Sequence, residues 1–305
     1  MTTELAHRSK RIESAIVSAA KPLYWSVRRE LWENRSIYIA PLAVAGVVLF
    51  GFMIGMFHLP AKMRTAMTLD PAKQHAALTM PYDIAAFLLL LTAFIVEVFY
   101  CLDALHGERR DRSILFWKSL PVSDFTTVLS KACIPLVVMP FLVFTIAFTT
   151  RTIMLLLNIA VLQGSGLSPA PLLAQLQFFQ SSLAMLYAFI VIALWRAPIY
   201  GWLLLISVWA RRATFLWAVL PVFAIGVVEK LAFNTPYIPH LLRYRLLGWF
   251  TQAFVFHAPG TAPLSPLASL APGKFLSTPG LWIGLAVAAI FLAAAIRLRR
   301  YREPI

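Results

Sequence analysis

Long apolar runs separated by short charged segments dominate the chain. A helix that crosses the roughly 30 Å of hydrocarbon in a bilayer needs about 20 apolar residues. Six regions qualify: Ile37 to Phe57, Ile84 to Leu102, Ile134 to Leu162, Leu183 to Trp209, Phe215 to Phe233 and Leu281 to Ile296. The pattern therefore predicts an all-α integral membrane protein with six transmembrane helices, in a domain of residues 37–302.

Two segments outside these runs also carry a structural pattern. From Ile12 to Leu31, apolar residues recur every three or four positions, and arginine and lysine residues occupy the other sides of the helix. This predicts an amphipathic interfacial helix within an N-terminal segment of residues 1–36. Residues 234–275 are rich in aromatic side chains but are interrupted by polar groups and prolines, so we expect them to lie in the outer interface or to re-enter the membrane partway.

Composition supports the membrane assignment. Of the 305 residues, 60% are hydrophobic and only 13% are charged, whereas about a quarter of a soluble domain is charged. The net charge of +14 would suit either a nucleic acid or the anionic surface of a membrane. The basic residues form short clusters between apolar runs, which favours membrane lipids as partners and argues against a nucleic acid.

The placement of lysine and arginine predicts the orientation. Cytoplasmic loops of membrane proteins keep an excess of these residues. With the N-terminus inside, the inner segments would hold 18 of the 27 lysine and arginine residues and the outer segments 6. We therefore expect both ends in the cytoplasm, including a tail of residues 303–305.

The most informative segment is the loop of residues 103–124 between the second and third runs. A short amphipathic helix is predicted around Arg110 to Leu120, followed by Pro121, which would end it. Ser123 and Asp124 can then cap the next helix. A helix anchored in this way between two spans is suited to receive a mechanical push from a soluble partner.

This loop resembles the membrane subunits of ATP-binding-cassette exporters, the type-2 permease family. There the second span is followed by an acidic-basic pair, a short helix, the sequence SLPVS or a close variant, and a lysine at the foot of the third span. The matching parts here are Glu108-Arg109, Ser113 to Lys118, Ser119 to Ser123, and Lys131. The span count, the interfacial helix and the segment before the last span extend the resemblance over residues 12–302. Residues 197–221 also look like a bacterial subgroup of the family.

The resemblance implies the permease subunit of an ATP-driven exporter in the bacterial plasma (inner) membrane. A cytosolic ATPase dimer that holds ATP and Mg would dock on the loop, and a second copy of this or a related permease would complete the pathway. The docking residues would be Glu108, Arg109, Arg110, Ser113, Ile114, Leu115, Trp117, Lys118, Leu120 and Pro121. The chain has no G-x-x-x-x-G-K-[ST] phosphate loop, so we expect it to bind no cofactor and not to be an enzyme.

Ionisable residues inside apolar runs are candidates for a pathway or gate, because they are costly to place in hydrocarbon. Glu97, Arg196 and Glu229 are such residues, whereas Arg151 is expected to mark the outer end of a shorter third span. The spacing of histidine and cysteine residues predicts no metal site, and no catalytic motif occurs.

Two other functions stay open. A secondary transporter or channel that works alone is disfavoured because the chain shows no internal repeat and no series of intramembrane acids. An intramembrane lipid-modifying enzyme would need polar groups clustered at one depth, and the apolar runs contain no such cluster.

Overall fold

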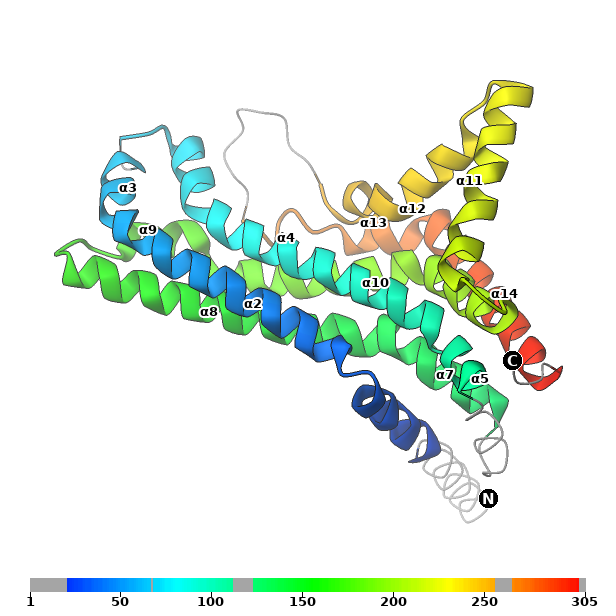
Figure 1. Ribbon diagram of the computed structural model, residues 1–305. Coiled ribbons are helices and arrows are strands. Elements are labelled where there is room, and N and C mark those ends of the chain that lie inside the picture. The colour runs from blue at the N-terminus through cyan, green and yellow to red at the C-terminus, as the bar shows by residue number, and fades with distance from the viewer. Residues whose placement is uncertain (1–20, 67, 112–122, 256–264, 302–305) are drawn as a thin grey trace, which may run out of the picture.

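The computed structural model describes residues 21–66, 68–111, 123–255 and 265–301. These residues form helices, joined by turns and by one isolated β-bridge between Phe254 and Leu270. Most of the long helices lie side by side along one axis, and the helix of residues 21–33 and the end of α14 lie toward the same end of the bundle (Figure 1).

Residues 21–33 form a helix that precedes the bundle. The elements that follow are α2 (Ser36–Gly55), η1 (Met56–His58), α3 (Leu59–Ala66), α4 (Pro71–Asp103), α5 (His106–Arg110), α7 (Asp124–Cys133), η2 (Ile134–Val138), α8 (Met139–Gly164), α9 (Ala170–Leu176), α10 (Phe178–Trp209), α11 (Thr214–Phe233), α12 (Tyr237–Ala253), α13 (Pro272–Ser277) and α14 (Pro279–Tyr301).

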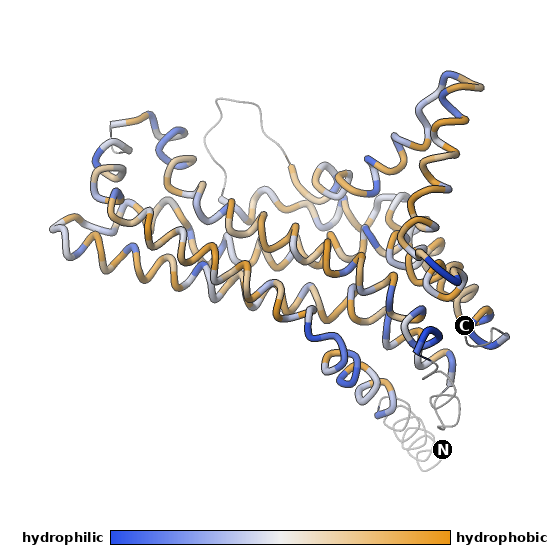
Figure 2. Tube along the Cα trace, viewed as in Figure 1, coloured by the Kyte–Doolittle hydropathy of each residue, from blue (hydrophilic) through white to orange (hydrophobic). Residues whose placement is uncertain are grey.

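Six helical stretches of the described residues are long and apolar enough to cross a membrane. They are Ser36–Ala61, Lys73–Arg110, Asp124–Gly164, Ala170–Trp209, Thr214–Phe233 and Pro279–Tyr301. Hydrophobic residues follow the long helices, and hydrophilic residues gather toward the ends of the bundle (Figure 2). The prediction of a helical chain with six candidate spans is confirmed for the described residues.

Several helices extend beyond the apolar runs. Helix α4 begins at Pro71, where proline suits the first helical turn, and its first turns are too polar to stand out in a hydropathy pattern. Helix α8 continues to Gly164, so the helix extends beyond Arg151, the expected outer end of the third span. At the base of that span, η2 is a turn of π-helix around Pro135, which lacks the amide hydrogen of a regular helix bond.

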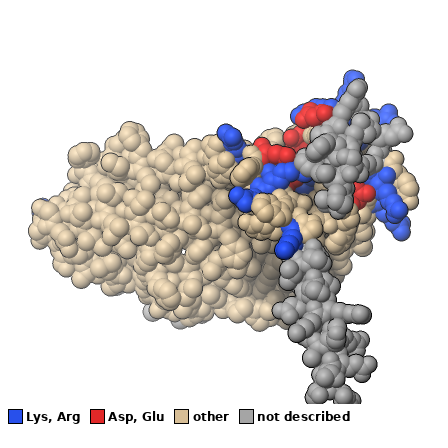
Figure 3. Space-filling model, turned by 90° about the horizontal axis from the view of Figure 1, so that it is seen from below, with Lys and Arg blue, Asp and Glu red and all other residues tan. Residues whose placement is uncertain are grey.

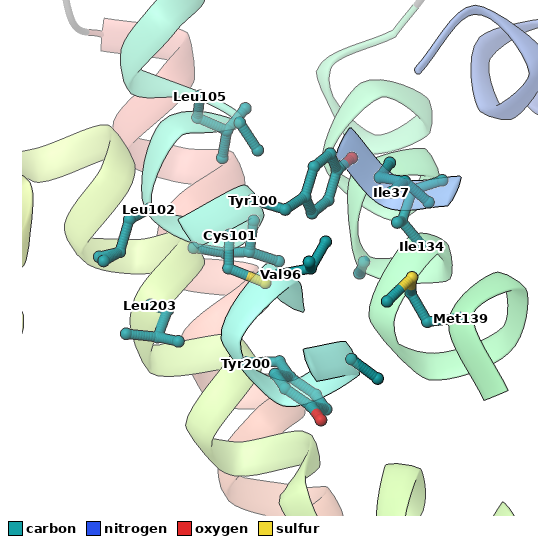
Figure 4. Packing of buried hydrophobic residues seen from close by; sticks show 14 of the residues in the cluster. Ile37, Val96, Tyr100, Cys101, Leu102, Leu105, Ile134, Met139, Tyr200 and Leu203 are labelled. Atoms are coloured by element: carbon teal, nitrogen blue, oxygen red, sulfur yellow. The ribbon is translucent and has the colours of Figure 1, made fainter. Parts of the chain in front are cut away.

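Helix α10 is the centre of the packing, with contacts to α4, α8, α11, α12 and α14. Helices α10 and α14 pack closely at Gly201 of α10. A Cβ atom added there would lie only 3.2 Å from the carbonyl oxygen of Ala288 on α14. The largest core cluster joins α4, α7, α8 and α10, and in Figure 4 Tyr100 points from α4 toward Ile37 at the start of α2. Cys101 and Cys133 are free thiols.

Helices α11 and α12 form a hairpin that leans away from the other long helices (Figure 1). Large apolar side chains on α11, such as Leu220 and Phe223, are exposed on the surface of the chain. Helix α12 returns toward α13 and α14, and the described part of the segment 234–275 holds α12 and the start of α13.

Candidate functional site

Charged side chains from the helix of residues 21–33, from α5, from α7 and from α14 meet at one end of the bundle. Figure 3 shows acidic and basic residues gathered at this end, while most of the remaining visible surface is uncharged. The group that we call the charge cluster comprises Arg29, Glu30, Glu108, Asp124, Lys131 and Arg299. Its three acids and three bases balance one another, which allows most of them to be buried.

Lys131 lies at the centre of the cluster. Its Nζ donates a hydrogen bond of 2.8 Å to Glu30 Oε1 and lies 3.1 Å from Glu108 Oε1. The side chains of Lys131 and Glu30 are each only 2% exposed. The hydroxyl of Tyr100 donates to the other Glu30 oxygen at 3.0 Å. The helix of residues 21–33 is therefore attached to the bundle by a buried ion pair.

Glu108 connects three elements to α5. Its Oε1 accepts from Arg29 at 3.2 Å, and its Oε2 accepts from Arg299 at 3.0 Å. Arg299, near the end of α14, also donates to Asp124 Oδ1 at 2.6 Å, at the start of α7. A displacement of α5 would therefore act on α7, on α14 and on the N-terminal helix together.

A second set of hydrogen bonds attaches α5 to the end of α10. The Ser207 hydroxyl accepts from the backbone N–H groups of Leu105 and His106, at 3.0 and 2.9 Å. Arg109 donates to the carbonyl oxygens of Val208 and Ala210. Free N–H groups at a helix start need acceptors, and here α10 supplies them from a distant part of the sequence.

The predicted docking residues fall into two groups. Ser113, Ile114, Leu115, Trp117, Lys118, Leu120 and Pro121, together with the helix predicted there, lie outside the described residues. Glu108 and Arg109 are 8% and 3% exposed, and their ion pairs and hydrogen bonds hold α5 in place. Arg110 is exposed and lies near Asp103 and Asp111, at 3.8 and 3.1 Å.

Sequence reasoning did not single out Glu30, Ser207 or Arg299 as site residues. Glu30 and Arg299 lie among the charges that flank apolar runs, and such charges are usually interpreted as indicating the orientation of the chain in the membrane. The Ser123 cap was predicted and is confirmed, because Ser123 Oγ accepts from the Thr126 amide at 3.1 Å.

Glu97 and Arg196 belong to a separate buried group between α4 and α10. Tyr200 donates to Glu97 Oε2 at 2.5 Å, and the Arg196 guanidinium lies 4.4 Å from the centre of the Phe94 ring. Glu97, Arg196 and Tyr200 line a small cavity of about 10 Å³, which is about the space of one water molecule. Glu97 and Arg196, proposed separately from sequence, therefore lie on facing helices around one small cavity.

Glu229 shares none of these contacts and lies at the turn between α11 and α12. Its carboxylate accepts from the backbone N–H groups of Tyr237 and Ile238 and from the Thr235 hydroxyl. These bonds satisfy free N–H groups at the start of α12 and fix the hairpin. Among its described contacts, Glu229 acts as a helix cap.

Arg151 lies inside α8 and is held by residues of neighbouring helices. Its guanidinium donates to the Ser181 hydroxyl at 2.7 Å and lies over the rings of Tyr82 and Phe178. These contacts give Arg151 a packing role within the bundle.

Comparisons with known proteins give no match: no family model, no curated protein and no solved structure matches the chain.

Proposed function

We propose that the chain is the permease subunit of an ATP-driven exporter that resembles the type-2 ATP-binding-cassette family. A separate cytosolic ATPase dimer would bind the loop of residues 103–124, and two permease copies would form the substrate pathway. The observation that carries the proposal is the position of Glu108, which lies in the first part of this loop and is ion-paired to Lys131 and Arg299. A push on the loop would reach α5 first and then the bases of α7 and α14.

The topology belongs to the same proposal. An even number of crossings puts both ends of a chain on one side, and the helix of residues 21–33 and the end of α14 are both ion-paired to Glu108 at one end of the bundle. The excess of lysine and arginine in the segments at this end favours the cytoplasm. We place the protein in the plasma (inner) membrane of a bacterium, with α12 and α13 on the outer side.

Burial of the charge cluster supports a mechanical role. Replacing one partner of a buried ion pair costs about 3–5 kcal/mol, because the remaining charge is left without compensation. Because its ion pairs are buried, the charge cluster would pass a displacement of α5 on to α7 and α14. The group of Glu97, Arg196 and Tyr200 lies between α4 and α10, where a relative shift of these helices would open or close its cavity.

The test is affinity purification of the chain from its native cells in mild detergent. We expect an ATPase to co-purify with wild type and to be lost from the Leu115→Ala, Trp117→Ala double variant. The matched control is the pair Ile54→Ala, Phe57→Ala, two exposed apolar side chains near the opposite end of the bundle. If no nucleotide-hydrolysing partner accompanies wild type, the exporter proposal fails.

A second candidate is a transporter that works alone, and the buried Glu97 with its Tyr200 partner favours it. Intramembrane acids often line ion or proton pathways. Such a protein would carry its substrate in proteoliposomes that contain this chain alone, and Glu97→Gln would abolish the dependence on an ion gradient. An exporter subunit alone would show no transport in the same vesicles.

A further inference from the structure

The small cavity between α4 and α10 is lined by three polar side chains. Its volume is about 10 Å³, which is about the space of one water molecule. Glu97 lines it from α4, whereas Arg196 and Tyr200 line it from α10. Arg196 and Tyr200 are four residues apart, so they lie on one face of α10. Three groups that can form hydrogen bonds therefore meet at a space that fits one small molecule.

The guanidinium of Arg196 is buried without a hydrogen bond to the described part of the chain. Arg196 is 8% exposed, and its guanidinium lies 4.4 Å from the centre of the Phe94 ring. The ring face offsets part of the cost of burying this charge, but the five N–H groups of the guanidinium still need acceptors. The Nε atom is fully enclosed, whereas the two Nη atoms keep accessible surface. An acceptor in the cavity would therefore reach the Nη atoms.

One carboxylate oxygen of Glu97 is also available at this cavity. Glu97 is 6% exposed, and its Oε2 accepts from Tyr200. Its Oε1 accepts from no described residue and keeps accessible surface. Glu97 and Arg196 make no direct ion pair in the described structure. The cavity thus lies between an acceptor that lacks a donor and donors that lack an acceptor.

The charges around the cavity favour a neutral occupant. An anion would be attracted by Arg196 but repelled by Glu97, and a cation would meet the opposite combination. The rest of the wall is apolar and includes Leu90, Met139 and Phe189, whose side chains offer an ion no strong ligand. Water is neutral and both donates and accepts, and a buried water makes about three hydrogen bonds.

We propose that one ordered water molecule binds in this cavity, where it donates to Glu97 Oε1 and accepts from the Arg196 guanidinium. The hydroxyl oxygen of Tyr200 is available to accept its second hydrogen. Such a bridge is nearly as favourable as a direct hydrogen bond, so the water links α4 to α10 inside the bundle. The site is the same whether the chain works with an ATPase or alone, so the inference does not depend on the exporter proposal.

The test is X-ray radiolytic labelling of the purified full-length protein in nanodiscs. X-rays generate hydroxyl radicals from water in place, so a buried side chain beside an ordered water is oxidised although bulk water does not reach it. Met139 lines the cavity, whereas Met154 of the same helix α8 does not, and each is 1% exposed. We expect Met139 to be oxidised about fivefold faster than Met154. Equal rates for the two methionines would overturn the proposal.

Two variants assign the oxidation to the proposed water. Ala193→Val adds apolar volume at the cavity, and Arg196→Leu removes a hydrogen-bonding partner of the water. Each is expected to lower the oxidation rate of Met139 to that of Met154. Ala197→Val is the matched control, because Ala193 and Ala197 are both 3% exposed on α10 but Ala197 does not line the cavity.

The comparison of the two methionines within each variant separates loss of the water from unfolding, since unfolding would raise both rates. Unchanged oxidation of Met139 in Ala193→Val and Arg196→Leu would refute the site.

Electron density of wild-type crystals identifies the occupant. We expect one peak within about 3.2 Å of both Glu97 Oε1 and an Arg196 nitrogen. An anomalous peak at this position after exchange into bromide would show a bound anion and contradict the proposal. A direct ion pair between Glu97 and Arg196 would contradict it as well.

Discussion

The ammonium group of Lys131 lies 2.8 Å from a carboxylate oxygen of Glu30, although 101 positions separate the two residues in the chain. Both side chains are almost fully buried. The N-terminal helix is thus a part of the bundle, fixed to the foot of α7, and its movements are linked to those of the third predicted span.

The first prediction concerns this ion pair. Lys131→Met would leave three acids and two bases in the charge cluster, although Glu30 and Glu108 would keep their contacts with Arg29, and we expect a loss of up to about 3–5 kcal/mol in the free energy of unfolding. The double variant Lys131→Met, Glu30→Gln restores the balance of acids and bases and should recover part of the loss. Thermal unfolding in detergent measures both.

The control for the ion pair is Arg110→Met, because Arg110 is 60% exposed in its contacts with Asp103 and Asp111. Exposed pairs contribute about 0–1 kcal/mol, so this variant should unfold close to wild type. Equal destabilisation by Lys131→Met and Arg110→Met would show that burial of the cluster is not important for stability.

The second prediction concerns the attachment of α5 to α10. Ser207→Ala removes the acceptor of two backbone N–H groups, and a buried donor left unpaired costs about 1–3 kcal/mol. We expect faster hydrogen exchange at Leu105 and His106 and a lower unfolding temperature. Ser130→Ala is the control, since Ser130 is equally buried but bonds only within its own helix, to Thr127. Unchanged exchange in Ser207→Ala would contradict this attachment.

The third prediction concerns the packing of Arg245 of α12 against Gly284 of α14. A Cβ atom at Gly284 would lie 2.5 Å from Arg245 Nη1, and Arg245 now lies 5.3 Å from the Trp195 ring centre. Gly284→Ala should therefore move the Arg245 guanidinium, the end of a flexible side chain, away from Trp195 while α12 keeps its place. Tryptophan fluorescence should change in Gly284→Ala and match wild type in Gly273→Ala, where the added atom meets nothing within 4 Å. An unchanged spectrum in Gly284→Ala would argue against close packing of Arg245 at Gly284.

Hydrophobic patterning predicted the candidate spans because a run of apolar residues is a local property of the sequence. It placed the helix ends less well. The polar first turns of α4, with Lys73 and His75, are helical but do not stand out as apolar. The helix continues past Arg151 because this single charge inside α8 is held by Ser181 and neighbouring rings.

The charge cluster was only partly predictable. Glu108 stood out through its position beside the SLPVS sequence, whereas Arg299 lies 191 positions away and pairs with it only after folding. A local pattern does not reveal such a contact. Glu97 and Arg196 were each visible as charges inside apolar runs, but the cavity that they share depends on how α4, α8 and α10 pack.

The fourth prediction tests the central proposal, that α5 and the charge cluster couple an ATPase to the membrane helices. The measurement is nucleotide hydrolysis by the co-purified complex in nanodiscs, for wild type, Arg299→Gln and Arg297→Gln. Arg299 bridges Glu108 and Asp124, whereas Arg297 lies exposed on the same helix. We expect Arg299→Gln to keep the ATPase bound but to return its hydrolysis rate to that of the free ATPase, and Arg297→Gln to match wild type. A wild-type rate in the Arg299→Gln complex would contradict coupling through the cluster.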